Sequence, residues 1–199
     1  MIGQLPKTLA VQGREYEIRS DYRNILTIIQ AYNDKELNDN EKALVCLTRM
    51  YVDVESIPKT GEAYQEALKR ATEFIECKLS EDKPGPRLVN WEKDEQLIFP
   101  SINKVAGTEI RLLPYMHWWT FLGYFQEAGK DDLWGMVLAI RQKKKRGKKL
   151  EKFEKEFYAS NRELCRIDDA EAGATPENML SEIYKSLLDE QKEGGGANG

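Results

Sequence analysis

The sequence predicts a mainly α-helical bundle that carries a small β-hairpin at its N-terminus. Apolar side chains recur at helical spacing through most of the chain, whereas the alternation typical of strands occurs only over residues 8–18. Charged residues make up 32% of the chain, which suits a helical protein with a modest core and a solvated surface. We expect one helical domain over residues 1–165, a linker over 166–175, an amphipathic helix over 176–193 and a disordered tail over 194–199.

The predicted hairpin lies in the stretch TLAVQGREYEI, which alternates apolar and polar residues on either side of Gln12-Gly13. This pattern predicts two short antiparallel strands joined by a tight turn. A lone hairpin is marginal in water, so we expect it to pack on helices or to join the sheet of a partner. The apolar residues that can share one face are Leu9, Val11, Tyr16 and Ile18.

Three helices are predicted after the hairpin. Ser20 or Asp21 can cap the first, and Asn38 with Glu41 can form a capping box for the second. Pro58 ends the second apolar run. The apolar faces are expected to comprise, in turn, Tyr22, Ile25, Ile28, Ile29 and Tyr32; Leu44, Leu47, Met50 or Tyr51, and Val54; and Tyr64, Ala67, Leu68, Ala71 and Ile75.

The stretch SEDKPGPRLVN, residues 80–90, is the clearest break in the chain. The helix predicted after it contains Pro100, so it either kinks or restarts there. Pro114 can occupy the first turn of the next helix, which Gly129 can close. Two further helices are expected. The inward side chains of the first are Leu133, Met136, Val137 and Ile140, and those of the second are Leu150, Phe153 and Phe157.

The stretch YMHWWTFLGYF, residues 115–125, contains the only histidine of the chain, beside two tryptophans. On a helix these residues form a broad apolar face, and the small Thr120 and Gly123 permit close approach by a neighbouring helix. A catalytic or metal-binding His117 would need partners, and the chain has no second histidine. We therefore expect a structural histidine that a backbone or carboxylate hydrogen bond satisfies. The predicted core signature is His117, Trp118, Trp119, Phe121 and Phe125.

Composition and missing motifs argue against several functional classes. Cys46, Cys77 and Cys165 are widely spaced, which indicates neither a disulfide framework nor a zinc site. The net charge is −4, and no signal peptide or long apolar run is present, so we expect no association with membranes. Templates for nucleophiles, metals and nucleotide loops all fail to match. We expect no enzyme activity, no catalytic residues, no metal and no cofactor.

Residues 141–149, RQKKKRGKK, hold seven cations in nine positions. Such a run can bind phosphates, can be the solvated end of a helix, or can dock on an acidic protein surface. It lacks interleaved aromatic residues, which disfavours single-stranded nucleic acid and favours docking on protein. The possible partner-binding residues of the run are Arg141, Lys143, Lys144, Lys145 and Arg146.

The sequence Thr175-Pro176-Glu177 is typical of the start of a helix. This last helix follows a linker, so it is either a final helix of the bundle or a helix that seeks a groove on a partner. Its possible partner-binding residues are Met179, Leu180, Ile183 and Leu187.

Several of these stretches together resemble a family of small siphophage proteins named after gene product fifteen. The resemblance covers roughly residues 9–165 and includes the hairpin followed by a first helix. The His-Trp-Trp-x-Phe element, with a Phe-Tyr pair downstream, is a fairly specific part of the resemblance. The matching residues are Asp94 and Ile98; Leu113, His117, Trp118, Trp119 and Phe121; Arg141 and Lys144; and Lys155, Phe157 and Tyr158.

The resemblance implies a tail morphogenesis gene that lies between those of the major tail protein and the tape measure protein. Proteins at that position typically act as tail assembly chaperones, which coat the tape measure protein in the host cytoplasm. The implied partners are the tape measure protein, the major tail protein, and a second copy or a longer form frameshifted near Gly194–Gly196. The alternatives are a structural tail or connector component of the virion and a nucleic-acid-binding protein that uses residues 141–149.

Overall fold

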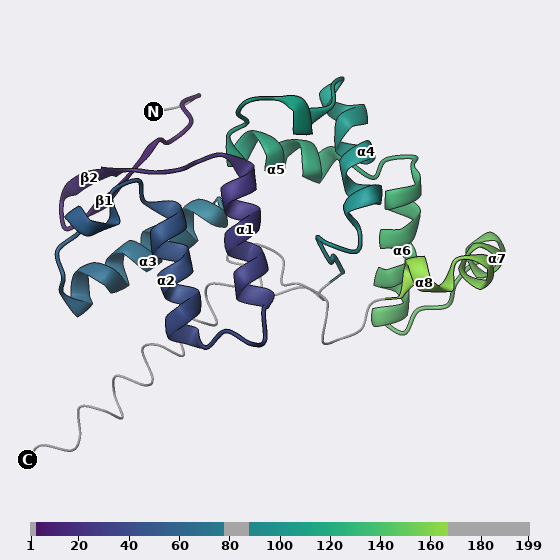
Figure 1. Cartoon of the computed structure of the whole chain (residues 1–199). Coiled ribbons are helices and arrows are strands. Elements are labelled where there is room, and N and C mark those ends of the chain that lie inside the picture. Colours follow the sequence, from purple (N-terminus) through teal and green to yellow (C-terminus); the bar gives the residue numbers. More distant parts are fainter. Residues whose placement is uncertain (1–2, 78–87, 167–199) are drawn as a thin grey trace, which may run out of the picture. The chain divides into compact units, whose positions relative to one another are not determined.

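The computed structural model describes residues 3–77 and 88–166, and it confirms a mainly α-helical chain with an N-terminal hairpin (Figure 1). The linker, the last helix and the tail predicted beyond residue 166 lie outside the described residues.

The described residues divide into two compact units, where the sequence predicts one domain. The first unit comprises the described residues up to 77 together with His117–Trp119. The second unit comprises residues 88–116 and 120–166.

The hairpin of the first unit consists of β1 (Thr8–Val11) and β2 (Arg14–Glu17), which pair antiparallel. Gln12 and Gly13 have φ values of 48° and 77°, so both turn residues adopt the left-handed conformation that suits a two-residue hairpin turn. Beyond β2, Ile18 pairs with Tyr51 in an isolated antiparallel bridge. The predicted hairpin is confirmed, and this bridge ties it to the end of α2.

Three helices follow: α1 (Tyr22–Asn33), α2 (Asp39–Met50) and α3 (Gly61–Ile75). A short 3-10 helix, η1 (Val54–Ser56), lies between α2 and α3. α1 packs on α2, α2 packs on α3, and α3 contacts β1.

The predicted helix caps of this unit form as expected. Asp21 accepts a hydrogen bond from the backbone N–H of Arg23 at the start of α1. Asn38 and Glu41 form a reciprocal capping box at the start of α2. Each cap satisfies a backbone donor that has no partner within its own helix.

Leu44 is wrongly predicted as a core residue. Leu44 is 61% exposed. The inward face of α2 has the spacing i, i+3, i+4, i+7 that starts at Ala43, one residue before Leu44. The buried residues of α2 are Ala43, Cys46, Leu47 and Met50. Alanine and cysteine are weaker markers of a core face than leucine, so the pattern pointed to the wrong residue.

The second unit contains α4 (Glu95–Ala106), η2 (Ile110–Leu112) and the part of α5 (Trp118–Glu127) from residue 120 onward. It also contains α6 (Leu133–Lys145), α7 (Lys152–Ser160) and α8 (Arg162–Cys165).

Two proline predictions have different outcomes. Pro100 lies within α4, which the structure assigns as one helix rather than two. Pro114 does not begin the next helix, so this prediction is wrong: α5 begins at Trp118. The reason is tertiary, because His117 pairs with Asp21 of the first unit in an antiparallel bridge and only then does the chain become helical.

Leu133 and Phe153 are also more exposed than the sequence predicts. Leu133 is the first residue of α6, and Trp134 is buried instead of it. Phe153 is 55% exposed, while Glu154 of the same helix is buried. The capping box that Glu154 forms with Glu151 turns the carboxylate, rather than the phenyl ring, toward the unit.

Close packing in the second unit depends on Gly135 rather than on Gly123. A Cβ atom on Gly135 would overlap the carbonyl oxygen of Gly129, whereas one on Gly123 would meet nothing within 4 Å. The Ser101 hydroxyl accepts from the Gly129 N–H at 2.8 Å and donates to Asp132, which in turn caps the Gly135 N–H. The close approach predicted at Gly123 is therefore wrong.

This contrast yields a matched pair of substitutions. Gly135→Ala should lower the free energy of unfolding, because the added methyl group forces the backbone around Gly129 to move. Gly123→Ala should raise it by about 0.5–1 kcal/mol, since alanine is the better residue in an exposed helix interior. Urea unfolding followed by circular dichroism measures both. Equal effects of the two substitutions would contradict the assigned packing.

Candidate functional site

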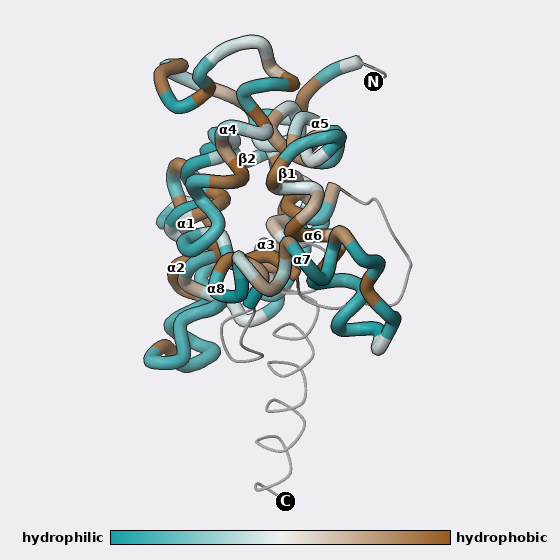
Figure 2. The backbone as a smooth tube through the Cα atoms, turned by 90° about the vertical axis from the view of Figure 1, so that its right-hand side faces the viewer, coloured by the Kyte–Doolittle hydropathy of each residue, from teal (hydrophilic) through white to brown (hydrophobic). Residues whose placement is uncertain are grey.

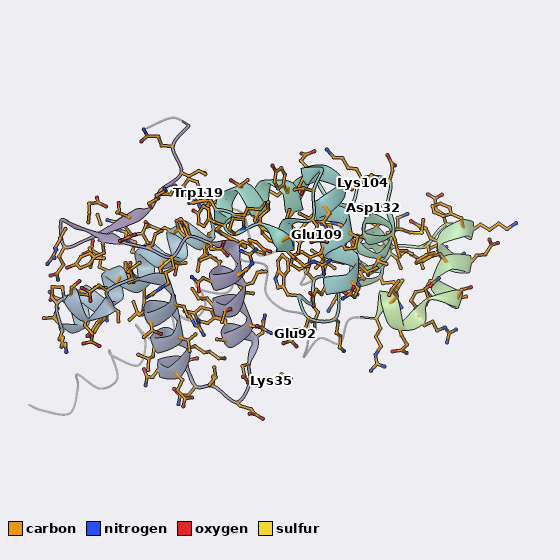
Figure 3. All side chains as sticks on the ribbon, turned by 45° about the horizontal axis from the view of Figure 1, so that its top comes forward. Lys35, Glu92, Lys104, Glu109, Trp119 and Asp132 are labelled. Atoms are coloured by element: carbon orange, nitrogen blue, oxygen red, sulfur yellow. The ribbon has the colours of Figure 1, made fainter. Side chains whose placement is uncertain are left out.

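Two tryptophans of the motif cap the end of α3 within the first unit. The indole N–H groups of Trp118 and Trp119 donate to the carbonyl oxygens of Ile75 and Phe74, both at 2.8 Å. These carbonyls lie in the last turn of α3, where helices leave acceptors without intrahelical partners. The backbone N–H of Trp118 also donates to Ser20, at 2.7 Å. The pair therefore joins α3 to the segment before α1; Figure 3 labels Trp119.

His117 acts as a cap rather than as an open reactive group. Its Nδ1 accepts from the backbone N–H of Trp119 at 3.1 Å, at the start of α5. Its Nε2 lies 2.9 Å from the Pro6 carbonyl oxygen, which can only accept, so Nε2 carries the proton of a neutral ring. The side chain is 2% exposed and meets the Phe74 and Trp119 rings edge-on.

The surroundings of His117 favour the neutral ring. Burial lowers the pKa of His117 below its ordinary value; the hydrogen bond to Pro6 opposes this, and the nearby Lys7 charge adds to it. A second proton would also have to occupy Nδ1, where it would face the N–H of Trp119.

The remaining aromatic residues of the predicted core signature lie in the second unit. Phe121 is fully buried, and the ring centroid of Phe125 lies 4.9 Å from that of Trp91. The Trp91 ring also contacts the Phe121 ring, and Phe99 of α4 contacts Phe121 as well. Trp91 carries no periodic pattern in the sequence, because it precedes α4, and its role was not predictable.

A buried ion pair between Asp94 and Arg141 joins three segments of the second unit. The two guanidinium Nη atoms contact the two carboxylate oxygens at 2.6 and 2.8 Å, and the side chains are only 3% and 4% exposed. Arg141 also donates to the carbonyl oxygens of Leu88 at 2.9 Å and Leu164 at 2.8 Å. The pair thus connects the segment before α4, helix α6 and helix α8.

Local geometry prepares both partners of this pair. Asp94 precedes α4 and accepts from the backbone N–H of Asn90 at 2.9 Å, which fixes its carboxylate. Arg141 lies on the buried face of α6, and its guanidinium lies 5.8 Å from the centre of the Trp134 ring. Only arginine offers the planar fork that two carboxylate oxygens and two carbonyls require.

Arg141 therefore does not contribute to an exposed basic surface, contrary to its prediction as a partner-binding residue. Because six other cations lie beside Arg141 in the sequence, its side chain was expected to be exposed rather than buried. Asp94 and Arg141 are both among the residues that carry the family resemblance. This is the one feature of the sequence that could have suggested that the two residues interact.

Two lysines of the run hold α7 against α6. Lys143 Nζ contacts both carboxylate oxygens of Glu154, at 2.7 and 2.8 Å. The Lys144 ammonium lies 3.8 Å from the centre of the Tyr158 ring and also bonds its hydroxyl. The hydrogen bond from Lys143, followed by that from Glu151, lowers the pKa of Glu154 below its ordinary value.

The other cations of this region are exposed on the α6–α7 connection and on α7, where Glu151 and Glu156 are exposed as well. Residues 146–151 are hydrophilic apart from Gly147 and Leu150; Figure 2 colours the backbone by hydropathy, and the exposed ring of Phe153 lies among the cations in the sequence. Lys145, the fourth predicted partner-binding residue, is exposed at the end of α6. The basic surface is defined here as Arg146, Lys148, Lys149, Lys152 and Lys155.

Predicted residues Met179, Leu180, Ile183 and Leu187 lie outside the described residues. Residues 3–77 and 88–166 contain no group of three or more His, Cys, Asp or Glu side chains that could hold a metal ion. No helix within the same ranges is long and apolar enough to cross a membrane.

Two of the cysteines have environments that disfavour a thiolate. Burial raises the pKa of Cys46 to about 12, even though a hydrogen bond with Tyr32 opposes the rise. Burial also raises the pKa of Cys165, against the charges of Arg141 and Lys144. A thiol with a raised pKa is a poor nucleophile and a poor metal ligand.

The fold and the motif residues define a helical protein whose most distinctive side chains bond to one another or to the backbone. The chain matches the family described as Bacteriophage Gp15 protein over residues 1–166 and belongs to that family. It is thus a phage protein. No curated protein and no solved structure matches the chain.

The buried ion pair predicts a large asymmetry between neighbouring cations. Arg141→Ala should lower the free energy of unfolding by about 3–5 kcal/mol, because it leaves the buried Asp94 carboxylate without its partner. Lys149→Ala, on the exposed surface of the same run, should change it by less than about 0.5 kcal/mol. Thermal and urea unfolding measure both. A mild effect of Arg141→Ala would show that the carboxylate is not held as described.

His117 predicts a pH dependence of stability. The folded-state pKa is lowered, so below the unfolded-state value of about 6.5 the unfolded chain binds more protons and stability falls. We expect a lower melting temperature at about pH 5.5 than at about pH 7.5.

Asparagine at position 117 provides the control. It can still accept from Trp119 but does not titrate, so His117→Asn should lower stability while flattening its change over the same pH range. An unchanged pH dependence in His117→Asn would assign the effect to another group.

Proposed function

We propose that this chain is a phage tail assembly chaperone that binds the tape measure protein in the host cytoplasm. Its membership of the Bacteriophage Gp15 family over residues 1–166 carries the proposal. A chaperone of this kind acts through surfaces that bind a long client, and it requires no reactive centre.

The internal roles of the motif residues support such a function. His117 caps a helix, Trp118 and Trp119 cap another, and Arg141 bonds to Asp94. Side chains used in this way hold the fold together, so recognition of a partner falls to other residues.

The exposed apolar side chains of both units provide candidate contacts for an apolar client. Leu112 is 82% exposed, the largest exposure among these residues. Large apolar groups on the surface bury area when a partner covers them, which favours association. The set comprises Leu5, Leu44, Val52, Val105, Leu112, Tyr115, Leu133 and Phe153.

The basic surface supplies a second kind of contact. Its cations flank the exposed Phe153, and an aromatic ring among cations suits an acidic amphipathic segment of a protein partner. Binding of nucleic acid through residues 141–149 is less well supported, because Arg141 is buried and Lys143 already pairs with Glu154.

Co-expression tests the proposal. The tape measure protein encoded by the same phage should stay soluble and co-purify when it is expressed with this chain, and it should precipitate when it is expressed alone. A tape measure protein that precipitates and remains unbound in both cases would refute the chaperone role.

Mass spectrometry of purified virions separates the chaperone from a structural tail or connector component. We expect the chain to be absent from finished particles and present in infected-cell extracts. Recovery from virions in a fixed ratio to the tail proteins would instead establish the structural role.

A further inference from the structure

Strand β1 is the outer strand of the small sheet in the first unit (Figure 1). The other side of β2 is occupied by the chain that follows α2. There the Arg19 N–H donates to the Met50 carbonyl oxygen at 2.8 Å, and the Val52 N–H donates to the Glu17 carbonyl oxygen at 3.0 Å. Among the described residues, no strand lies beside β1 on the side away from β2.

The pairing register shows which backbone groups of β1 point away from β2. The Ile18 N–H donates to the Lys7 carbonyl oxygen at 2.9 Å, so these two residues form a hydrogen-bonded pair. Hydrogen-bonded and non-hydrogen-bonded pairs alternate along antiparallel strands, so every second residue counted from Lys7 bonds to β2. Thr8, which is exposed, and Ala10, which is half-buried, therefore direct their N–H and C=O groups outward.

This outer edge is closed at both ends and open in the middle. The Pro6 carbonyl oxygen accepts from His117 Nε2 at 2.9 Å, and the Gln12 N–H donates to the Glu66 carboxylate at 3.0 Å. The four outward groups of the two residues between them bond to nothing else in the described part of the chain. A row of two open donors and two open acceptors is a template for one more strand, and the closed ends limit the pairing to this short row.

We propose that β1 pairs antiparallel with β1 of a second copy of this chain, about a two-fold axis between the two Leu9 residues. In this register Thr8 of each copy faces Ala10 of the other, and each such pair exchanges two hydrogen bonds. All the open groups of both strands are then satisfied. A two-fold pairing uses the same surface on both copies and closes on itself, so it yields a dimer and not a fibre.

The side chains along β1 suit a second copy. The half-buried Leu9 meets its own counterpart, Lys7 faces the uncharged Val11, and the facing residues at positions 8 and 10 are small and uncharged. Glu15 and Glu17 belong to β2, one strand further from the partner, so they do not oppose each other directly. The pairing thus places no like charges opposite one another, as a stable cross-strand contact requires.

The shared edge is short, so we expect a weak dimer with a Kd of about 0.1–1 mM. Weak pairing of this kind becomes populated when copies lie side by side on one long client. It would therefore suit the proposed chaperone role, although the pairing itself does not depend on that role.

Disulfide trapping tests the register. Residues at position 9 of the two copies form a non-hydrogen-bonded pair with Cα atoms about 4.5 Å apart, whereas those at position 8 lie about 9 Å apart. A disulfide requires Cα atoms within about 7 Å, so under mild oxidation Leu9→Cys should yield about tenfold more linked dimer than Thr8→Cys. Both variants carry Cys77→Ser, which removes the half-buried native thiol.

A charge variant tests the edge without new thiols. In Thr8→Lys with Ala10→Lys, the added ammonium groups face Glu17 and Glu15 within the same chain, which favours the hairpin. Across the two-fold pairing they face each other, which opposes the dimer. Sedimentation velocity over a concentration series should show self-association weakened about tenfold.

The control is Asn40→Lys with Leu44→Lys, which adds the same charge to exposed positions of α2 and should leave self-association unchanged. Circular dichroism verifies that all variants fold. Equal weakening by the two charge variants would assign the effect to net charge rather than to the edge. Equal disulfide yields at positions 8 and 9 would exclude the two-fold register. An unmodified chain that stays monomeric up to about 1 mM would refute the pairing itself.

Discussion

The buried contact between Asp94 and Arg141 fixes how the second unit is assembled. The desolvation cost of two buried opposite charges is offset only when they pair closely and form further hydrogen bonds. Here the guanidinium contacts two carboxylate oxygens and two backbone carbonyls. Because Leu88 and Leu164 supply those carbonyls, a shift of α6 along its neighbours would leave the buried Arg141 and Asp94 charges without their hydrogen bonds. The Nε of Arg141 remains buried without a partner, so the pair contributes more to register than to net stability.

In the first unit, buried polar groups are likewise satisfied by hydrogen bonds, but the groups are neutral. The last turn of α3 leaves carbonyls that can accept further hydrogen bonds, and the indole N–H groups of Trp118 and Trp119 donate to two of them. The Phe74 carbonyl also accepts from the backbone N–H of Cys77. Each indole thereby buries a large apolar surface and also satisfies its polar atom. The side chains of the His-Trp-Trp element thus hold the fold of this unit together.

Features that depend on neighbours in the sequence were predictable. The hairpin turn at Gln12-Gly13 and the capping box of Asn38 with Glu41 involve residues at most three apart, and both form as expected. Features that depend on distant partners were not. In the sequence, Arg141 is one cation of a basic run, and nothing nearby indicates its ion pair with Asp94, which lies 47 residues earlier. The start of α5 likewise depends on the bridge to Asp21.

Burial patterns failed where a small or polar residue took the inward position. Leu44 and Phe153 lie outward because Ala43 and Glu154 occupy the inner faces of their helices. Periodicity weights leucine and phenylalanine above alanine and glutamate, so it shifts the predicted face by one residue. The direction of Glu154 depends on its bond to Lys143, which comes from another helix, as well as on its capping box with Glu151.

The basic run shows how one stretch can serve both the fold and a surface. Arg141, Lys143 and Lys144 bond to Asp94, Glu154 and Tyr158 of the same unit. The cations that follow lie on the exposed connection, where they take no part in those bonds. A ligand of the outer cations can therefore arrive or leave without breaking the contacts that hold α6, α7 and α8, so exchange of partners at this surface need not unfold the unit beneath it.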